Sequence, residues 1–233
     1  MKMERGSGSS SDMKKQITSI SDSLKGYERE QNKDGSLVLE HETYFLAIIF
    51  DGVSSANRAK EGVTLAKEFI KKVHDNYTQD GTLRLADLVC ATNDVLVASG
   101  IPTPYATISS ICIPFHGKNA TIVSLGDSRI YGITGQEMTQ LTKDDNPPDD
   151  ENVITKCLGM EELERIQVRE KNIELEAKRL LLCTDGFYHV MEDRPELFHE
   201  VLNYQRLGNI KKRLRKELSG DNYDDASYVI VDW

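Results

Sequence analysis

Residues 44–50 constrain the fold more than any other segment, because all seven are apolar or aromatic. A continuous apolar run of this length suits a β-strand that is buried on both faces. It is much shorter than the ~20 residues that a membrane-spanning helix requires. We therefore expect residues 44–50 to form an interior strand of a globular domain.

The spacing of apolar residues changes along the chain. Residues 60–77 and 83–97 repeat apolar positions every three or four residues, which predicts two helices that each place one face against a core. From residue 106 the period becomes two, and turns at Gly117 and Gly126 divide residues 106–133 into three short strands. Three successive strands with tight turns predict an antiparallel meander.

The remaining elements set the fold class. Further strands are expected at residues 16–24, 36–40, 165–170, 178–183 and 226–231. Helices are expected around residues 187–191, 195–202 and 208–218. Strands and helices thus follow one another in blocks, which favours an α+β layered domain over alternating βαβ units. The polar residues 142–152, which include two prolines, are expected to form a long loop.

Composition excludes several classes of function. The 233 residues carry 29 Lys and Arg against 38 Asp and Glu, a formal net charge of −9. Nucleic acids and anionic membranes need a basic surface, so neither is expected as a partner. The four cysteines lack zinc-binding spacing, which is typical of reduced thiols in a cytoplasmic protein. Residues 1–13 are interpreted as a flexible tail or a cloning remnant, and residues 14–233 as a single domain.

Aspartates stand at the ends of three apolar strands. Asp51 and Asp185 follow such strands and precede glycine, and the pair Asp224 and Asp225 comes directly before the last strand. A carboxylate packs poorly there, but it is held rigidly at a sheet edge. Carboxylates that converge from several strand ends favour Mg²⁺ or Mn²⁺ over softer metals. A lone Asp-Gly is more often only a turn, but three such sites together with Asp127 favour a divalent-metal site.

Six segments resemble the motifs of one family, the type 2C, metal-dependent protein serine/threonine phosphatases. Each segment alone is a weak signal, but they occur in family order from about residue 17 to the C-terminus. The segments are Arg29-x-x-Asn32-x-Asp34, Asp51-Gly-Val-Ser-Ser55, Pro104-Tyr-Ala-Thr107-Ile, Gly126-Asp-Ser-Arg129-Ile-Tyr131, Cys183-Thr-Asp-Gly-Phe187 and Asp224-Asp-Ala-Ser227.

The resemblance implies a four-layer αββα sandwich, in which helices flank two antiparallel sheets and a two-metal centre lies at one end. It implies that Asp51 bridges two Mn²⁺ or Mg²⁺ ions and that the carbonyl of Gly52 binds the second. Asp185 and Asp224 would hold the first ion. Asp127 corresponds to an aspartate that contributes to a third, looser ion.

The same resemblance implies the reaction. Arg29 corresponds to the arginine that grips the substrate phosphate with its planar fork, and Asp34 would support the metal ligands from behind. Two ions ~3.5 to 4 Å apart would bridge a water, lower its pKa and direct the hydroxide at phosphorus without a phosphoenzyme. The implied function is hydrolysis of phosphoserine and phosphothreonine in phosphorylated proteins, in cytoplasmic signalling, by a monomer. Cys183 would then belong to the core.

Several positions depart from the family pattern. Lys33 stands where the family commonly has Glu or Gln near the second metal, and a cation there should weaken the binding of that ion. Val53 replaces a histidine that some members have as a proposed general acid, so water would protonate the leaving group. Ser54 and Ser55 replace two glycines.

Three questions stay open at this stage. Asp221 precedes an asparagine and is a second candidate for the C-terminal ligand, although Asp224 aligns with the family without an insertion. The departures at Lys33 and residues 53–55 allow an alternative function, a pseudophosphatase that keeps the fold as a binding module. A third possibility is a phosphatase with one narrow signalling partner, such as an anti-sigma-factor antagonist, because the motif at residues 224–227 also resembles that branch.

Overall fold

The computed structural model of the chain describes residues 16–135, 137–150 and 153–233, so the tail expected at residues 1–13 lies outside the described residues. Its strands form two five-stranded antiparallel sheets. The first sheet contains, in spatial order, β1 (Thr18–Leu24), β12 (Ala226–Asp232), β11 (Arg179–Cys183), β8 (Arg129–Ile133) and β9 (Met138–Gln140). The second contains β10 (Lys171–Glu174), β7 (Asn119–Leu125), β6 (Ala106–Pro114), β3 (Tyr44–Gly52) and β2 (Gly35–Glu40).

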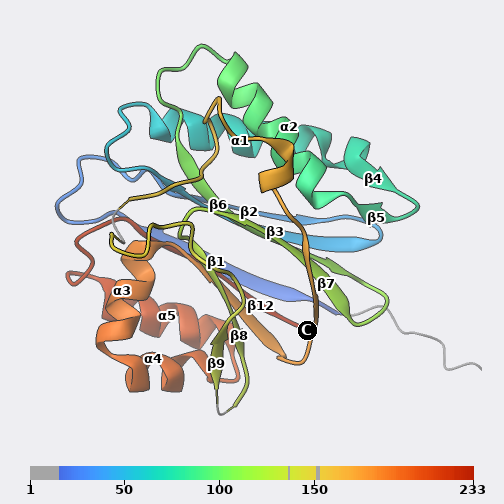
Figure 1. Cartoon of the computed structure of the whole chain (residues 1–233). Coiled ribbons are helices and arrows are strands. Elements are labelled where there is room, and N and C mark those ends of the chain that lie inside the picture. The colour runs from blue at the N-terminus through green and yellow to red at the C-terminus, as the bar shows by residue number, and fades with distance from the viewer. Residues whose placement is uncertain (1–15, 136, 151–152) are drawn as a thin grey trace, which may run out of the picture.

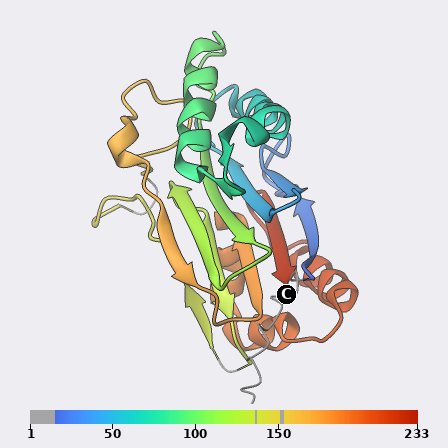
Figure 2. The ribbon, with the colours of Figure 1, turned by 90° about the vertical axis from the view of Figure 1, so that its right-hand side faces the viewer.

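Helices cover the outer face of each sheet (Figures 1 and 2). The second sheet carries α1 (Ala59–Val73) and α2 (Leu85–Ala98), and the first carries α3 (Asp185–Asp193), α4 (Pro195–Leu202) and α5 (Leu207–Leu218). The expected α+β fold, a four-layer αββα sandwich, is therefore confirmed. Short 3-10 turns at His74–Tyr77 and Arg165–Gln167 and a hairpin of β4 (Thr78–Gln79) and β5 (Thr82–Leu83) complete the fold.

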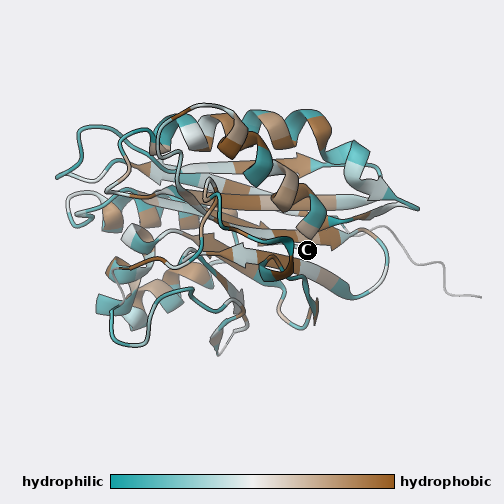
Figure 3. Cartoon of the chain, turned by 45° about the horizontal axis from the view of Figure 1, so that its top comes forward, coloured by the Kyte–Doolittle hydropathy of each residue, from teal (hydrophilic) through white to brown (hydrophobic). Residues whose placement is uncertain are grey.

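Three hydrophobic layers hold the sandwich together, one between the sheets and one under each group of helices. The strand β3 shows how its sequence serves two of them. Leu46, Ile48 and Phe50 point toward α1 and α2, whereas Phe45 and Ile49 point into the space between the sheets. Successive side chains of a strand alternate between its faces, so a continuous apolar run fills two layers at once. Figure 3 shows the apolar stripes along the strands.

Two expectations from the sequence were wrong. The three strands after residue 106 do not form one meander, because β7 pairs with β6 whereas β8 crosses to the other sheet and pairs with β11. The crossing follows Gly126, whose φ of +93° suits glycine and whose position leaves no room for a side chain beside Thr107. Residues 165–170 begin with a 3-10 turn, and the neighbouring strand β10 starts only at Lys171.

The cysteines behave as expected from their spacing. All four are free thiols, and Cys112, Cys157 and Cys183 are buried in the core. Burial raises the pKa of the Cys183 thiol well above its ordinary value, which keeps it protonated and unreactive. Among the described residues no helix is both long and apolar enough to cross a membrane.

Candidate metal centre

Acidic residues from both sheets meet at one end of the sandwich, where α3 begins. Asp51 lies at the end of β3, and Asp185 is the first residue of α3. Asp127 occupies the turn between β7 and β8, and Asp224 stands just before β12. They line a cavity of about 480 Å³. The cavity is also lined by Arg29, Val53, Ser54, Ser55, Arg129, Asp144, Asn146, Ile154, Tyr188, His189, Glu192.

Two glycines allow the segments of this end to approach closely. A Cβ on Gly52 would lie 2.8 Å from the Cβ of Lys33, and one on Gly186 would lie 2.9 Å from the carbonyl carbon of Asp225. Real Cβ atoms do not come so close to other heavy atoms, so both positions require glycine. The Asp-Gly pairs thus bring two carboxylates next to neighbouring backbone, which explains why glycine follows Asp51 and Asp185.

Asp51 and Asp185 affect each other's protonation. Burial and the nearby Asp185 raise the pKa of Asp51 well above its ordinary value. Burial also raises the pKa of Asp185. At Asp127 the pKa rises to about 6, through burial and repulsion by Asp185. Carboxyl groups this close favour one another's protonated form unless a cation lies between them.

Asp34, expected behind the ligands, lies in the same cluster and is 4% exposed. One of its oxygens accepts a hydrogen bond from the hydroxyl of Thr184, at 2.9 Å. Its other oxygen is buried and has no partner in the described part of the chain, and the same holds for one oxygen of Asp127. A buried acceptor without a partner is costly. These two oxygens and the mutual repulsion of the carboxyl groups fit a bound divalent cation.

Asp224 is engaged by Arg29. The guanidinium of Arg29 donates from Nε to Oδ1 of Asp224 at 2.6 Å and from Nη2 to Oδ2. Asp221, the other candidate, points away from the cluster, since its side chain is 60% exposed and pairs with Arg194 at 3.1 Å. The geometry therefore favours Asp224 over Asp221 as the acid that belongs to this site.

The acids gather without forming a finished coordination shell. In the described ranges, no group of three or more His, Cys, Asp and Glu side chains is placed to hold a metal ion as it stands. Arg29 donates to both oxygens of Asp224, so a metal ion at that carboxylate would compete with the guanidinium. The residue types fit a divalent ion. In the observed arrangement, however, the carboxylate of Asp224 binds Arg29.

Asp225 has a supporting role that the sequence did not reveal. Its carboxylate accepts hydrogen bonds from the backbone N–H groups of Gly26 at 2.9 Å and Lys33 at 2.7 Å. The amine of Lys33 donates to the carbonyls of Ser54 and Ala56. Asp225 and Lys33 thus tie the loop before β2 to the loops before β12 and after β3.

Arg129, from the Gly-Asp-Ser-Arg segment, forms part of the cavity wall and is only 16% exposed. Its guanidinium pairs with Asp144 at 2.8 Å and with Glu192 at 2.6 Å, and lies 3.6 Å from the ring centroid of Tyr188. These partners come from the loop after β9 and from α3. Arg129 therefore holds the part of the loop at residues 142–150 against the helix that carries Asp185.

Replacing Arg129 with methionine should lower the free energy of unfolding by about 3 kcal/mol, because removal of one partner from a largely buried ion pair leaves the others uncompensated. Urea denaturation measures the change. Arg58→Met is the matched control, since Arg58 pairs with Glu61 at an exposed position, where such a pair contributes no more than about 1 kcal/mol. Equal effects of the two substitutions would show that the Arg129 network does not anchor the loop.

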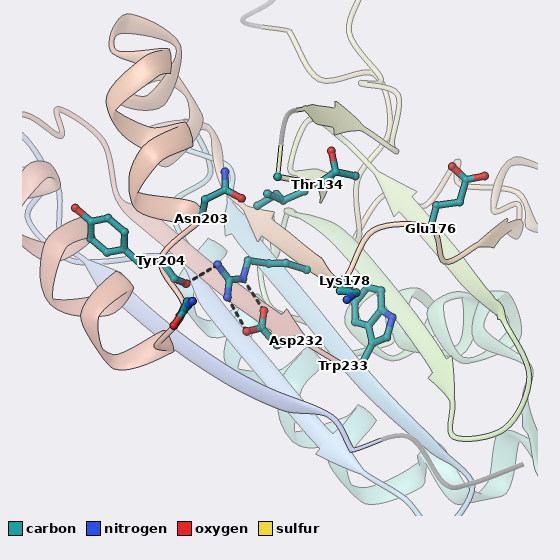
Figure 4. A pocket seen from close by; sticks show the side chains of 11 residues that line it. Thr134, Glu176, Lys178, Asn203, Tyr204, Asp232 and Trp233 are labelled. Carbon is teal, nitrogen blue, oxygen red and sulfur yellow. Dashed lines mark hydrogen bonds and ion pairs between the residues drawn. The ribbon is translucent and has the colours of Figure 1, made fainter.

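A second cavity, of about 530 Å³, lies at the opposite end of the first sheet, near the C-terminal end of β12 (Figure 4). Its main charged groups are already paired: Arg179 binds both carboxylate oxygens of Asp232, at 2.6 and 2.7 Å, and also the carbonyl of Tyr204. Arg179 thereby joins β11 and β12 to the end of α4. We interpret this cavity as a structural junction, remote from the acidic cluster.

Comparison with known families decides what these motifs have in common. The family model of protein phosphatase 2C matches residues 28–219, which is more than half of the chain. The chain belongs to the protein phosphatase 2C family. The matched range includes Arg29, Asp51, Asp127 and Asp185, whereas Asp224 lies beyond its end. A search of curated proteins gives no match.

Solved structures support the same fold. The serine/threonine phosphatase Stp1 from Staphylococcus aureus is 16% identical, with a TM-score of 0.78, and the match covers 97% of this chain and 99% of that one. The serine/threonine phosphatase PstP/Ppp of Mycobacterium tuberculosis is 24% identical, with a TM-score of 0.72 and coverage of 93% and 98%. RsbX, in complex with magnesium, is 17% identical, with a TM-score of 0.67 and coverage of 93% and 94%. At these identities the likeness concerns the fold.

Proposed function

We propose that this protein phosphatase 2C member is a Mn²⁺- or Mg²⁺-dependent enzyme that hydrolyses phosphoserine and phosphothreonine in proteins. The observation that carries the proposal is the meeting of Asp51, Asp127 and Asp185 in one cavity beside Arg29, where a buried oxygen of Asp127 has no partner in the described part of the chain. A related structure, the catalytic domain of PstP, contains two manganese ions. We further propose that residues 14–233 act as one catalytic domain, as a monomer.

Five groups would hold the ions. They are the carboxylates of Asp51, Asp185, Asp224 and Asp127 and the carbonyl of Gly52, with Asp127 serving a third ion. Bound divalent ions supply a water of lowered pKa and neutralise charge on the phosphoryl oxygens. All donors in this set are hard oxygens, which are the ligands that Mg²⁺ and Mn²⁺ prefer.

The protein's own residues would bind and orient the phosphate. The guanidinium of Arg29 lines the cavity and presents a planar fork that matches two phosphate oxygens. In the proposed cycle it leaves Asp224 for the substrate, and this exchange would free the carboxylate when a cation and a phosphate are both present. The hydrogen bond between Asp34 and Thr184 would position the backbone directly before Asp185. Val53 has no proton to donate, so solvent would protonate the leaving group.

The direct test is hydrolysis of a phosphothreonine peptide, with and without Mn²⁺ and after addition of a chelator. We expect turnover that requires the ion and stops when it is removed. Asp224→Asn should remove most of the turnover, and Asp221→Asn should retain it. Absence of phosphate release with Mn²⁺ in excess, for several peptides and for an aryl phosphate, would contradict the proposed activity.

Manganese should also stabilise the fold. A ligand that binds only the native state adds about 2.7 kcal/mol to the free energy of unfolding at a concentration one hundred times its Kd. We therefore expect the melting temperature to rise with Mn²⁺ concentration in differential scanning fluorimetry, and the rise to be much smaller in Asp51→Asn. The same rise in both proteins would place the ion outside the acidic cluster.

One observation favours a second candidate, a pseudophosphatase that binds a phosphoprotein without hydrolysing it. Arg29 already neutralises Asp224, and the ammonium of Lys33 is fixed beside the loop after Gly52. The guanidinium would oppose a metal ion at Asp224, and the ammonium would oppose one at the carbonyl of Gly52. Calorimetric titration with Mn²⁺ separates the candidates: the enzyme should show at least two sites, and the pseudophosphatase at most one weak site.

A further inference from the structure

Two exposed tyrosines form a pair at the end of the molecule that carries the acidic cluster. Tyr27 is 53% exposed and Tyr223 is 65% exposed, and their ring centroids lie 4.9 Å apart at an interplanar angle of 49°. Apolar side chains scattered singly on a surface are common, but two large aromatic side chains in contact and open to solvent are typical of binding surfaces. The pair has no role in the metal centre described above.

The backbone forces these two side chains together. A Cβ on Gly26 would lie 2.5 Å from the carbonyl carbon of Asp224, so the two loops touch at a position that admits only glycine. Next to this contact, the N–H of Tyr27 donates to the carbonyl of Asn222 at 3.2 Å. The amide of Asn222 donates in turn to the carbonyl of Lys25. The aromatic pair is thus built on a fixed junction of two loops.

Burial and the neighbouring Tyr223 raise the pKa of Tyr27 to about 12, so its hydroxyl remains neutral under ordinary conditions. The outward faces of the rings stay open. An aromatic ring carries negative charge on its face, and this attracts a guanidinium or ammonium placed over it.

The pair lies next to the phosphate-binding side of the cavity. Tyr27 is two residues before Arg29, and Tyr223 is directly before Asp224; Arg29 and Asp224 both line the cavity. A phosphorylated side chain that reaches Arg29 from a peptide would therefore bring neighbouring residues of that peptide over the aromatic pair.

The charges around the pair favour a cationic neighbour. Glu28 and Glu30 flank it, are exposed, and form no ion pair within the described ranges. The nearby ammonium of Lys25 donates to the carbonyls of Gly26 and Arg29. An arginine or lysine of the substrate would meet two free carboxylates and two ring faces, whereas an acidic residue would be repelled.

We propose that Tyr27 and Tyr223 form a docking surface for an arginine or lysine side chain adjacent to the phosphorylated residue of the substrate. The inference rests on the proposed phosphatase function and adds a substrate class, basic phosphoproteins. The surface selects among phosphopeptides by the residue beside the phosphate, while the acidic cluster and Arg29 act on the phosphate itself.

The test compares three phosphothreonine peptides that differ only in the residues on both sides of the phosphothreonine, which are Arg, Leu or Glu. We expect kcat/KM in the order Arg, Leu, Glu. In Tyr27→Leu/Tyr223→Leu, which keeps apolar side chains but removes the rings, the ratio of Arg to Leu peptides should fall about three- to fivefold, the size of an exposed cation–π contribution. Ile166→Ala is the control, because Ile166 is another exposed large apolar residue, at 69%, and is not among the residues that line the cavity.

Binding of the same labelled peptides to Asp185→Asn, followed by fluorescence anisotropy, gives a second readout that needs no turnover. We expect Asp185→Asn to bind the Arg peptide more tightly than the Leu peptide. A weaker preference when Tyr27→Leu and Tyr223→Leu are combined with Asp185→Asn supports the docking surface. If the peptides bind with that preference but the unmodified protein hydrolyses none of them, the proposed hydrolysis fails and the docking surface stands. A Leu preference, or an Arg preference unchanged by the double substitution, overturns the inference while hydrolysis persists.

Discussion

Asp185→Asn should lower kcat for a phosphothreonine peptide by at least about a thousandfold, which corresponds to about 4 kcal/mol of transition-state stabilisation. The carboxylate of Asp185 lines the cavity near Asp51 and the turn that carries Asp224, and it is proposed to hold the first ion. An amide has the same shape but no charge, so the ion would lose a ligand while the packing is retained. Divalent ions supply several kcal/mol of charge stabilisation in such reactions, and the expected loss reflects that contribution.

The control for this prediction is Asp221→Asn. Its side chain is largely exposed and pairs with Arg194 outside the cavity, so kcat should stay within about twofold of the unmodified protein. Asp185→Asn should melt no lower than the unmodified protein in the absence of metal, because it removes a carboxylate that repels its neighbours. More than a tenth of the activity remaining in Asp185→Asn would show that Asp185 is not a ligand on which the reaction depends.

Local sequence patterns predicted most of the helices and strands. They failed where pairing between distant segments determines which sheet a strand joins. The apolar run at residues 44–50 indicated a strand buried on both faces, and α4 begins and ends at the expected residues. The period-two pattern indicated that residues 129–133 form a strand, but a period cannot say which sheet the strand joins. The partners of β8 are β11 and β9, and this choice depends on the turn at Gly126. Likewise, the strand expected at residues 165–170 begins instead with a 3-10 turn, Arg165–Gln167.

The site shows the same limit more sharply. Asp-Gly pairs at strand ends identified residues that the structure brings into one cavity, because rigid strand ends carry them there. The ion pair between Arg29 and Asp224 joins positions 195 residues apart, and no local pattern contains such a contact. Lys33 was expected to face the second metal, yet its ammonium is held by two backbone carbonyls. Side-chain partners of this kind follow from the packing of loops that only the fold brings together.

Gly186→Ala should disturb the site from outside the proposed ligand set. The added methyl would collide with the carbonyl of Asp225, so either the start of α3 or the turn before β12 must move. Overpacking of this kind costs about 1 to 3 kcal/mol, which thermal or urea unfolding will measure. Asp185 and Asp224 sit on the two segments that would separate, and a misplacement of about 1 Å can lower a rate about a hundredfold. Activity should therefore fall much more than the loss of stability alone implies.

Gly208→Ala provides the matched substitution in another helix. No atom lies within 4 Å of a Cβ at Gly208, and alanine favours a helix over glycine by up to about 1 kcal/mol, so this variant should be as stable as the unmodified protein or more stable, with unchanged activity. If Gly186→Ala had the same stability and activity as Gly208→Ala, the turn at Asp224 and Asp225 would be able to move away from the added methyl group. Asp224 would then owe its position to Arg29 rather than to α3, and displacement of Arg29 by phosphate would release the carboxylate altogether.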